Sequence, residues 1–187
     1  MQKAQYRKVG LVESLWITHS VQANSSSTVR PQWAQINVTG GSIRPTAVQQ
    51  QIYAPDTTLN RWLPSIAADH DGNMAIGYST SNASVFPSIA YAGRLATDPL
   101  NQLSQGEVQL VAGGGSQKNT CGGAGPCDRW GDYSAMSIDP ADDCTFWYVN
   151  QYYSSQANGD SGNWSTRIGA FKFPSCGGTV VPRIAHC

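Results

Sequence analysis

The sequence predicts an all-β protein made of repeated antiparallel units, and three observations support this prediction. Charged residues make up only 13% of the 187 residues, whereas glycine is frequent, with 19 residues. This composition suits a fold rich in β-turns, because turns use glycine, asparagine and serine. No stretch of useful length has the 3.6-residue apolar period of a helix. The third observation is an internal repeat.

Two segments of the chain repeat each other. Arg61-Trp62 recurs as Arg129-Trp130, and residues 64–78 then align without a gap with residues 134–148. Each copy predicts a strand, a tight turn and a second strand, because turn-forming residues separate two β-prone runs. The repeat therefore indicates structural units of the same kind.

A fainter copy of the repeat lies upstream, where residues 13–20 match residues 72–79. In all three units a further strand is expected after the copy, and in the first two a fourth strand follows as well. The additional strand candidates are residues 32–38, 47–53, 88–94, 107–111 and 166–173.

Four antiparallel strands per unit, repeated along the chain, indicate β-propeller blades. A β-sandwich is the alternative, but it leaves the Arg-Trp repeat unexplained. We expect three blades within residues 1–176, at about residues 5–55, 61–112 and 128–176, the last without an evident fourth strand. Residues 177–187 are expected to be a tail foreign to the repeat.

Three blades are too few to close a propeller, which needs about four to eight. We therefore expect two copies of the chain to form a six-bladed ring as a homodimer. The other possibility is that the chain is the C-terminal half of a longer protein. In either case the last blade leaves an unpaired strand edge that invites pairing.

The charge balance excludes two classes of partner. Lys and Arg number 12, as do Asp and Glu, so the formal net charge is zero. A nucleic-acid binder and a polybasic membrane binder both need excess positive charge, and no apolar run is long enough to span a membrane. Residues 1–7 lack the apolar segment of a signal peptide. The 5 cysteines nevertheless indicate a secreted or periplasmic parent protein.

The cysteines predict two disulfides. Cys121 and Cys127 suit a bridge within a long glycine-rich loop, and Cys144 and Cys176 would tie the last unit together. The second bridge would stabilise the fold by roughly 3–4 kcal/mol in the chain-entropy model. Zinc is the alternative, although no Cys-x-x-Cys pair is present. Cys187 is left without a partner.

Four segments resemble the C-terminal part of secreted bacterial proteins with a sialidase-like β-propeller. The resemblance extends over residues 5–176 and implies a propeller fold and secretion more than a particular activity. The Asp-box motif of sialidases is absent from its usual place between the third and fourth strands. The segments that carry the resemblance are residues 91–100, 129–134, 139–148 and 171–176.

The candidate substrate-binding residues are Arg61, Arg129, Trp62 and Trp130. In a propeller, the first residues of an innermost strand lie at the tunnel mouth. The segment at Arg61 is similar to the Arg-Ile-Pro element of sialidases, whose arginine binds a substrate carboxylate through its bidentate fork. The alternative is a clamp between blades, in which the arginine stacks on the tryptophan or pairs with Asp132.

The candidate catalytic residues are Asp132, Tyr133 and His19. Asp132 is inserted near the tunnel mouth and would occur twice around a dimer axis, where paired carboxylates bind a metal and activate water. This assignment rests on analogy with hydrolytic propellers of the paraoxonase kind. His19 aligns with Tyr78 and Tyr148 and is either a general base or a hydrogen-bonded residue at a strand end.

The turn of the second unit offers candidate ligands for Ca²⁺ or another divalent ion, because its side chains carry hard oxygen atoms. The alternative is that these side chains cap the turn by bonding to its own backbone. The candidate ligands in this turn are Asp69, Asp71 and Asn73, and the equivalent turn of the third unit carries Asp139, Asp142 and Asp143. Asp132, near the tunnel mouth, is a separate candidate ligand.

Two functions stay open. The first is a metal-assisted hydrolase of broad specificity, acting on an ester, phosphoester or glycoside at the tunnel mouth. The gathering of charged residues at the predicted tunnel-facing strand starts favours this function. The alternative is a non-catalytic propeller module that binds a glycan or a protein through arginine and aromatic side chains. The expected partner, besides a second copy of the chain, is a small-molecule or glycan ligand.

Overall fold

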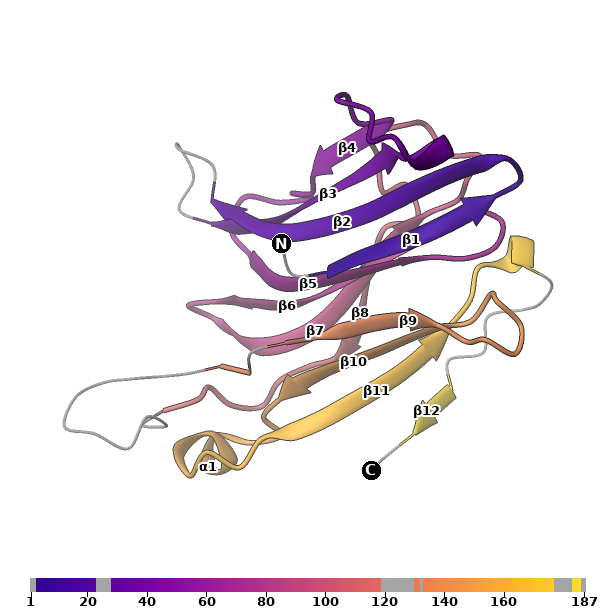
Figure 1. The fold of residues 1–187 in the computed structure, drawn as a ribbon. Coiled ribbons are helices and arrows are strands. Elements are labelled where there is room, and N and C mark those ends of the chain that lie inside the picture. Colours follow the sequence, from indigo (N-terminus) through magenta and orange to yellow (C-terminus); the bar gives the residue numbers. More distant parts are fainter. Residues whose placement is uncertain (1–2, 23–27, 119–129, 132, 177–182, 186–187) are drawn as a thin grey trace.

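The chain folds into three antiparallel sheets that follow one another along the sequence (Figure 1). A computed structural model describes residues 3–22, 28–118, 130–131, 133–176 and 183–185. Within each sheet the strands are neighbours in chain order, so every sheet is a simple up-and-down meander. The prediction of an all-β protein is confirmed.

Each sheet corresponds to one of the three predicted units. Sheet 1 contains β1 (Lys3–Val9), β2 (Val12–Gln22), β3 (Val29–Asn37) and β4 (Gln49–Ile52). Sheet 2 contains β5 (Asn60–Ala68), β6 (Met74–Asn82), β7 (Val85–Arg94) and β8 (Glu107–Val111). Sheet 3 contains β9 (Ala135–Ile138), β10 (Phe146–Tyr152), β11 (Ser165–Phe171) and β12 (Arg183–Ala185). The last unit, expected to lack a fourth strand, has only this short β12 in that position.

Helical structure is confined to one-turn segments in the described part of the chain. The 3-10 turn η1 (Thr39–Gly41) follows β3, the short helix α1 (Gln156–Asp160) follows β10, and the 3-10 turn η2 (Pro174–Cys176) follows β11. Ser155 caps α1 by accepting a hydrogen bond from the backbone N–H of Asn158. None of the described helices has the length and apolar character needed to cross a membrane.

The predicted tight turn between β5 and β6 is formed by residues 69–73. The backbone N–H of Asp69 donates to the carbonyl oxygen of Asn73 at 2.9 Å, which closes the turn. Gly72 adopts φ +84°, a left-handed conformation that glycine reaches without steric cost. The Asp-Gly pair therefore marks this turn for a physical reason.

Sheets 1 and 2 pack face to face through alternate residues of their strands. Successive side chains of a strand point to opposite faces, and in β2 the residues Ser14, Trp16 and Thr18 are buried while their neighbours are only partly so. Trp16 belongs to one apolar cluster with Ile76 and Tyr78 of β6. We call the face that points to the following sheet the trailing face, and the face that points to the preceding sheet the leading face.

Sheets 2 and 3 pack in the same way. Ala75 on the trailing face of sheet 2 contributes to a second apolar cluster with Phe146 and Tyr148 on the leading face of sheet 3. Sheet 2 is consequently covered on both faces, and all residues from Met74 to Thr80 in β6 are buried. The middle sheet is the core of the molecule.

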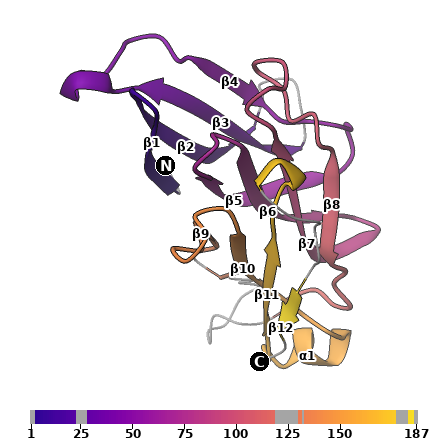
Figure 2. The same ribbon diagram turned by 90° about the vertical axis from the view of Figure 1, so that its right-hand side faces the viewer.

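The two outer faces of the stack are not covered by the described part of the chain. On the leading face of sheet 1, Leu15, Ile17 and His19 are partly exposed. On the trailing face of sheet 3, Trp147 and Val149 are partly exposed. The described strands form an open stack and no closed ring (Figure 2).

Gly77 tests the packing between sheets 2 and 3. A Cβ atom at this position would lie 2.5 Å from the ring of Tyr148. Gly77 and Tyr148 are both buried, so neither can move aside cheaply. We expect Gly77→Ala to lower the free energy of unfolding by about 1–3 kcal/mol in urea denaturation.

The matched control for this prediction is the double variant Gly77→Ala/Tyr148→Leu. Because the smaller side chain removes the ring atoms that the new methyl group meets, the cost of Gly77→Ala should shrink in the Tyr148→Leu background. Equal costs in both backgrounds would show that the ring is not the obstacle.

Candidate functional site

A cleft of about 260 Å³ lies between sheets 1 and 2, at the end where the β1–β2 and β5–β6 turns are found. Sheet 1 supplies polar side chains to it from all four of its strands, and sheet 2 supplies the β5–β6 turn and the end of β7. The lining residues that the argument uses are Arg7, Ser14, Gln35, Gln49, Asp71 and Arg94.

Arg94 is the most unusual residue of this cleft. It is the last residue of β7 and only 2% exposed. Its guanidinium donates one hydrogen bond, from Nη2 to the carbonyl oxygen of Asp98 at 2.7 Å, while Nε has no partner in the described part of the chain. Burial lowers the pKa of Arg94, and the charge of Asp98 opposes this effect. A buried cation without a carboxylate partner is costly and needs an explanation.

A chain of three polar side chains forms the opposite wall. Gln49 donates from Nε2 to Oε1 of Gln35 at 2.6 Å, and Gln35 donates from Nε2 to the hydroxyl of Ser14 at 2.9 Å. Gln49 is 4% exposed, and its Oε1 atom accepts no hydrogen bond from any described residue. The wall therefore ends in an unused acceptor beside the cleft.

Arg7 at the rim is already engaged. Its two terminal nitrogens donate to the two carboxylate oxygens of Asp143 at 2.7 and 2.6 Å, which ties β1 to the β9–β10 turn. These bonds, with the Arg7 charge, hold the pKa of Asp143 below its usual value against the smaller opposing effect of burial. Each of the two arginines that line the cleft keeps an Nε without a described partner. The charge of Arg7 is paired with a carboxylate, whereas the guanidinium of Arg94 bonds only to a carbonyl oxygen among the described residues.

Arg61, the predicted carboxylate binder, has a different environment at the opposite end of β5. It is 1% exposed and donates to Glu107 at 2.6 and 3.0 Å, to Asp56 at 2.6 Å and to the carbonyl oxygen of Leu59. Tyr78 also donates to Glu107, at 2.7 Å. Four of the five guanidinium donors are used, which leaves little for a substrate carboxylate. The partners belong to sheet 2 and to the segment just before it, so Arg61 holds its own unit together and does not form the expected clamp between blades.

The tryptophans that follow the two repeated arginines do lie together. Trp62 and Trp130 meet edge to face with ring centroids 5.2 Å apart, and Trp130 meets Tyr153 at 5.6 Å. Tyr133 is 86% exposed near this end of the sheets. Arg129 and Asp132 lie outside the described residues, so their predicted roles stay predictions.

The predicted metal ligands of the second unit close their own turn. Asp69 is fully buried and accepts hydrogen bonds from the backbone N–H groups of Asp71 and Asn73 and from the Asn73 amide, at 2.8–3.0 Å. Burial raises the pKa of Asp69 even against these bonds. Asp139 repeats the pattern by accepting from the N–H of Ala141. The arrangement favours turn capping over a calcium site.

His19 lies far from the cleft, on the leading face of sheet 1. It lines a separate hollow of about 350 Å³ together with Gln32, Arg44 and Gln50. Its position on this face corresponds to that of Tyr78 and Tyr148 in the other two sheets, in agreement with the sequence alignment.

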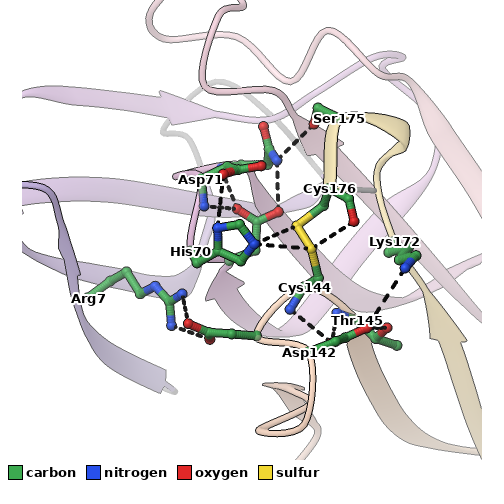
Figure 3. Close-up of a disulfide and its surroundings, with 12 residues drawn as sticks. Arg7, His70, Asp71, Asp142, Cys144, Thr145, Lys172, Ser175 and Cys176 are labelled. Atoms are coloured by element: carbon green, nitrogen blue, oxygen red, sulfur yellow. Dashed lines mark hydrogen bonds and ion pairs between the residues drawn. A yellow bond between two sulfur atoms is a disulfide. The ribbon is translucent and has the colours of Figure 1, made fainter. Parts of the chain in front are cut away.

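The predicted disulfide between Cys144 and Cys176 is present, with Cα atoms 5.9 Å apart (Figure 3). His70 lies against it, with Nε2 3.5 Å from Sγ of Cys144 and 3.4 Å from Sγ of Cys176. The other predicted pair, Cys121 and Cys127, lies outside the described residues.

Sequence reasoning missed Arg94, Gln35 and Gln49 as site residues. Arg94 stands at the end of a run of alanine, glycine and apolar residues, and a lone charge in such a strand was the available signal. No comparable signal in the sequence marks the two glutamines, because glutamine is an ordinary residue in such segments. Comparisons with protein-family models, curated proteins and solved structures found no match to the chain.

Asp56 provides a test of the Arg61 cluster. Partial burial opposes its ionisation, but hydrogen bonds from Arg61, Leu59 and Thr58 outweigh it, so its pKa lies well below the usual value. The stabilisation by Asp56 is therefore fully present above about pH 4 and is lost as the pH falls through the lowered pKa. Because the Asp56 side chain is 39% exposed, we expect Asp56→Asn to cost only about 1 kcal/mol near neutral pH.

Urea denaturation of both proteins from about pH 6 to about pH 2 checks this expectation. The difference in unfolding free energy should be largest at the upper end and shrink toward the lower end. In an Arg61→Met background the difference should be small at every pH. A difference that is constant with pH would refute the ion-pair explanation.

Proposed function

We propose that the chain is a non-catalytic binding module that recognises a small, hydroxyl-rich ligand bearing a carboxylate, such as an acidic sugar, in the cleft between sheets 1 and 2. The observation that carries the proposal is the buried guanidinium of Arg94, which has no carboxylate partner in the described part of the chain. The planar fork of an arginine matches a carboxylate with two parallel hydrogen bonds.

The opposite wall of the cleft adds specificity. Ser14, Gln35 and Gln49 form a connected row, and the free Oε1 of Gln49 is an acceptor suited to a ligand hydroxyl. Ligand sites commonly combine a few placed polar groups of this kind with apolar walls. Val9, Val12 and Leu100 supply apolar surface to the same cleft.

A binding role has more support than the metal-assisted hydrolase predicted from the sequence. The carboxylates of Asp69 and Asp139 are held by their turns, and that of Asp143 by Arg7. Asp132, on which the hydrolytic proposal depends, lies outside the described residues. The cleft shows no nucleophile with an adjacent base among the residues that the structure describes.

We also propose that two copies of the chain close a six-bladed propeller. The repeat supports this, because Ile17 and His19 on the open leading face correspond to Ile76 and Tyr78, and again to Phe146 and Tyr148. Those four residues are fully buried by the preceding sheet. The open face of sheet 1 thus has the residue pattern of a face that another sheet covers, and the trailing face of sheet 3 is the kind of face that covers it.

In a ring closed in this way, the leading face of sheet 1 in each copy would pack against the trailing face of sheet 3 in the other copy. The two contacts would repeat the packing already present between sheets 1 and 2 and between sheets 2 and 3. The disulfide supports a secreted or periplasmic location for such a protein.

Arg94→Met tests the binding proposal. Removal of an unpaired buried cation should leave the unfolding free energy unchanged or raise it by about 1–4 kcal/mol. Binding of N-acetylneuraminate or glucuronate, measured by calorimetry, should weaken at least about tenfold through loss of charged hydrogen bonds. Galactose, which lacks the carboxylate, should bind equally to both proteins.

The matched control is Arg44→Met, because Arg44 is an exposed arginine outside this cleft. It should alter neither stability nor acidic-sugar binding. The proposal is wrong if Arg94→Met destabilises the chain by several kcal/mol and leaves binding of the acidic sugars as it was.

Substitutions on the two open faces test the ring. Native mass spectrometry should give twice the mass of the single chain for the wild type, and the single-chain mass for both Ile17→Asp and Trp147→Asp, because each buries a charge in the contact. Leu11→Asp is the control, since Leu11 is 88% exposed in the β1–β2 turn. A monomeric wild type would exclude the dimer.

A further inference from the structure

A histidine, a carboxylate and a disulfide meet where turns from sheets 2 and 3 converge (Figure 3). His70 and Asp71 come from the β5–β6 turn, Cys144 precedes β10, and Cys176 ends η2. The ligand atoms of His70, Cys144 and Cys176 all lie within 4.8 Å of one another. Neither the binding cleft nor the packing of the sheets requires a histidine at this position.

The histidine ring is oriented as in a metal ligand. Its Nδ1 lies 2.9 Å from Oδ1 of Asp71, so the carboxylate holds the proton on that nitrogen. Nε2, on the other side of the ring, then directs its lone pair toward the two sulfur atoms at 3.5 and 3.4 Å. Histidines that bind metals usually donate their second N–H to such a carboxylate.

The backbone around the cluster is held by contacts other than the disulfide. The N–H of His70 donates to the carbonyl oxygen of Asp143 at 3.0 Å, and Asp143 is fixed by Arg7. The N–H of Cys176 donates to the carbonyl oxygen of Phe173 at 3.0 Å, and Ser175 accepts from Asn73 at 3.1 Å. Opening of the S–S bond would therefore leave the three ligand residues close together.

We propose that Cys144, Cys176 and His70 form a redox-gated binding site for a zinc-class ion, which is closed in the disulfide form and opens on reduction. A dithiol reductant supplies two electrons and two protons, the S–S bond breaks, and the reductant is oxidised to its own disulfide. Each thiol then releases its proton to solvent when the metal binds, which leaves two thiolates and one imidazole as ligands.

Two thiolates and one imidazole suit Zn²⁺, which prefers sulfur and nitrogen donors in a tetrahedral arrangement. The three protein ligands leave the fourth position for water. Access is possible because the His70 side chain is 46% exposed, although the two cysteines are buried. The oxygen-rich turns suggested calcium from the sequence, whereas this cluster selects a softer ion.

Metal titration of the full chain with Cys121, Cys127 and Cys187 replaced by serine tests the site, because only Cys144 and Cys176 then remain. After reduction with a phosphine, we expect one Co²⁺ per chain, with a thiolate-to-cobalt charge-transfer band that one equivalent of Zn²⁺ abolishes. The oxidised protein should give no such band.

Variants separate the three ligands from their surroundings. His70→Ala should weaken Zn²⁺ binding by the reduced protein at least about tenfold, and Asp71→Asn, which only orients His70, should weaken it by about 10–100-fold. Asp56→Asn, a carboxylate change outside the cluster, should leave zinc affinity as in the parent. Equal zinc affinity with and without His70, or equal binding by the oxidised form, overturns the proposal.

Thermal unfolding covers the case in which the reduced protein is unstable. Zn²⁺ should raise the Tm of the reduced protein and leave that of the oxidised protein unchanged, because the metal stabilises only the form that binds it. A reduced chain that stays unfolded in the presence of Zn²⁺ also overturns the proposal.

Discussion

The rest of the structure depends on the burial of sheet 2 on both of its faces. A strand that is covered on one side alternates apolar and polar residues, whereas β6 is buried throughout from Met74 to Thr80. One row of its side chains packs against sheet 1 and the other against sheet 3. The same close packing requires a glycine at position 77, because the ring of Tyr148 occupies the space that a side chain would need.

Face-to-face packing of the sheets also decides which buried polar groups find hydrogen-bond or ion-pair partners and which do not. At one end of β5, Arg61 is neutralised by Asp56 and Glu107 and joins β5 to β8. At the other end of the sheet, Arg94 is equally buried but keeps donors that no described side chain uses. In a chain with few charges, this contrast between a satisfied and an unsatisfied buried arginine is the basis of the proposal that Arg61 is structural and Arg94 binds a ligand.

The turns at the Arg94 end of the sheets form a second organised region. The guanidinium of Arg7 in sheet 1 forms an ion pair with Asp143 of the β9–β10 turn. The side-chain amide of Asn73 in the β5–β6 turn donates a hydrogen bond to Ser175 of the third unit. These contacts connect all three sheets without help from the apolar core. The cleft between sheets 1 and 2 and the His70 cluster therefore lie at the same end of the molecule, since Asp71 lines the cleft and contacts His70.

The sequence by itself determined the strands, their grouping into three units, the tight turn at Asp71-Gly72 and the bridge between Cys144 and Cys176. These features follow from local rules: the two-residue period of a strand, the conformational freedom of glycine, and a repeat that forces equivalent residues into equivalent places. The equivalence of His19, Tyr78 and Tyr148 belongs to this group. The strand and turn signals are contained within a few neighbouring residues. The repeat and the cysteine pair can be found by comparing segments of the sequence with one another, without knowledge of how the sheets pack.

Only the tertiary structure decided which polar side chains are satisfied. The predicted binder Arg61 and the overlooked Arg94 are both arginines in strands, and they differ in whether carboxylates far away in the sequence reach them. Glu107 forms an ion pair with Arg61 from β8, whereas no described carboxylate forms an ion pair with Arg94, although the charge of Asp98 acts on it. The proximity of His70 to two cysteines more than 70 residues further on likewise arises from sheet stacking. Site chemistry depends on such long-range contacts, and these form only when the sheets pack.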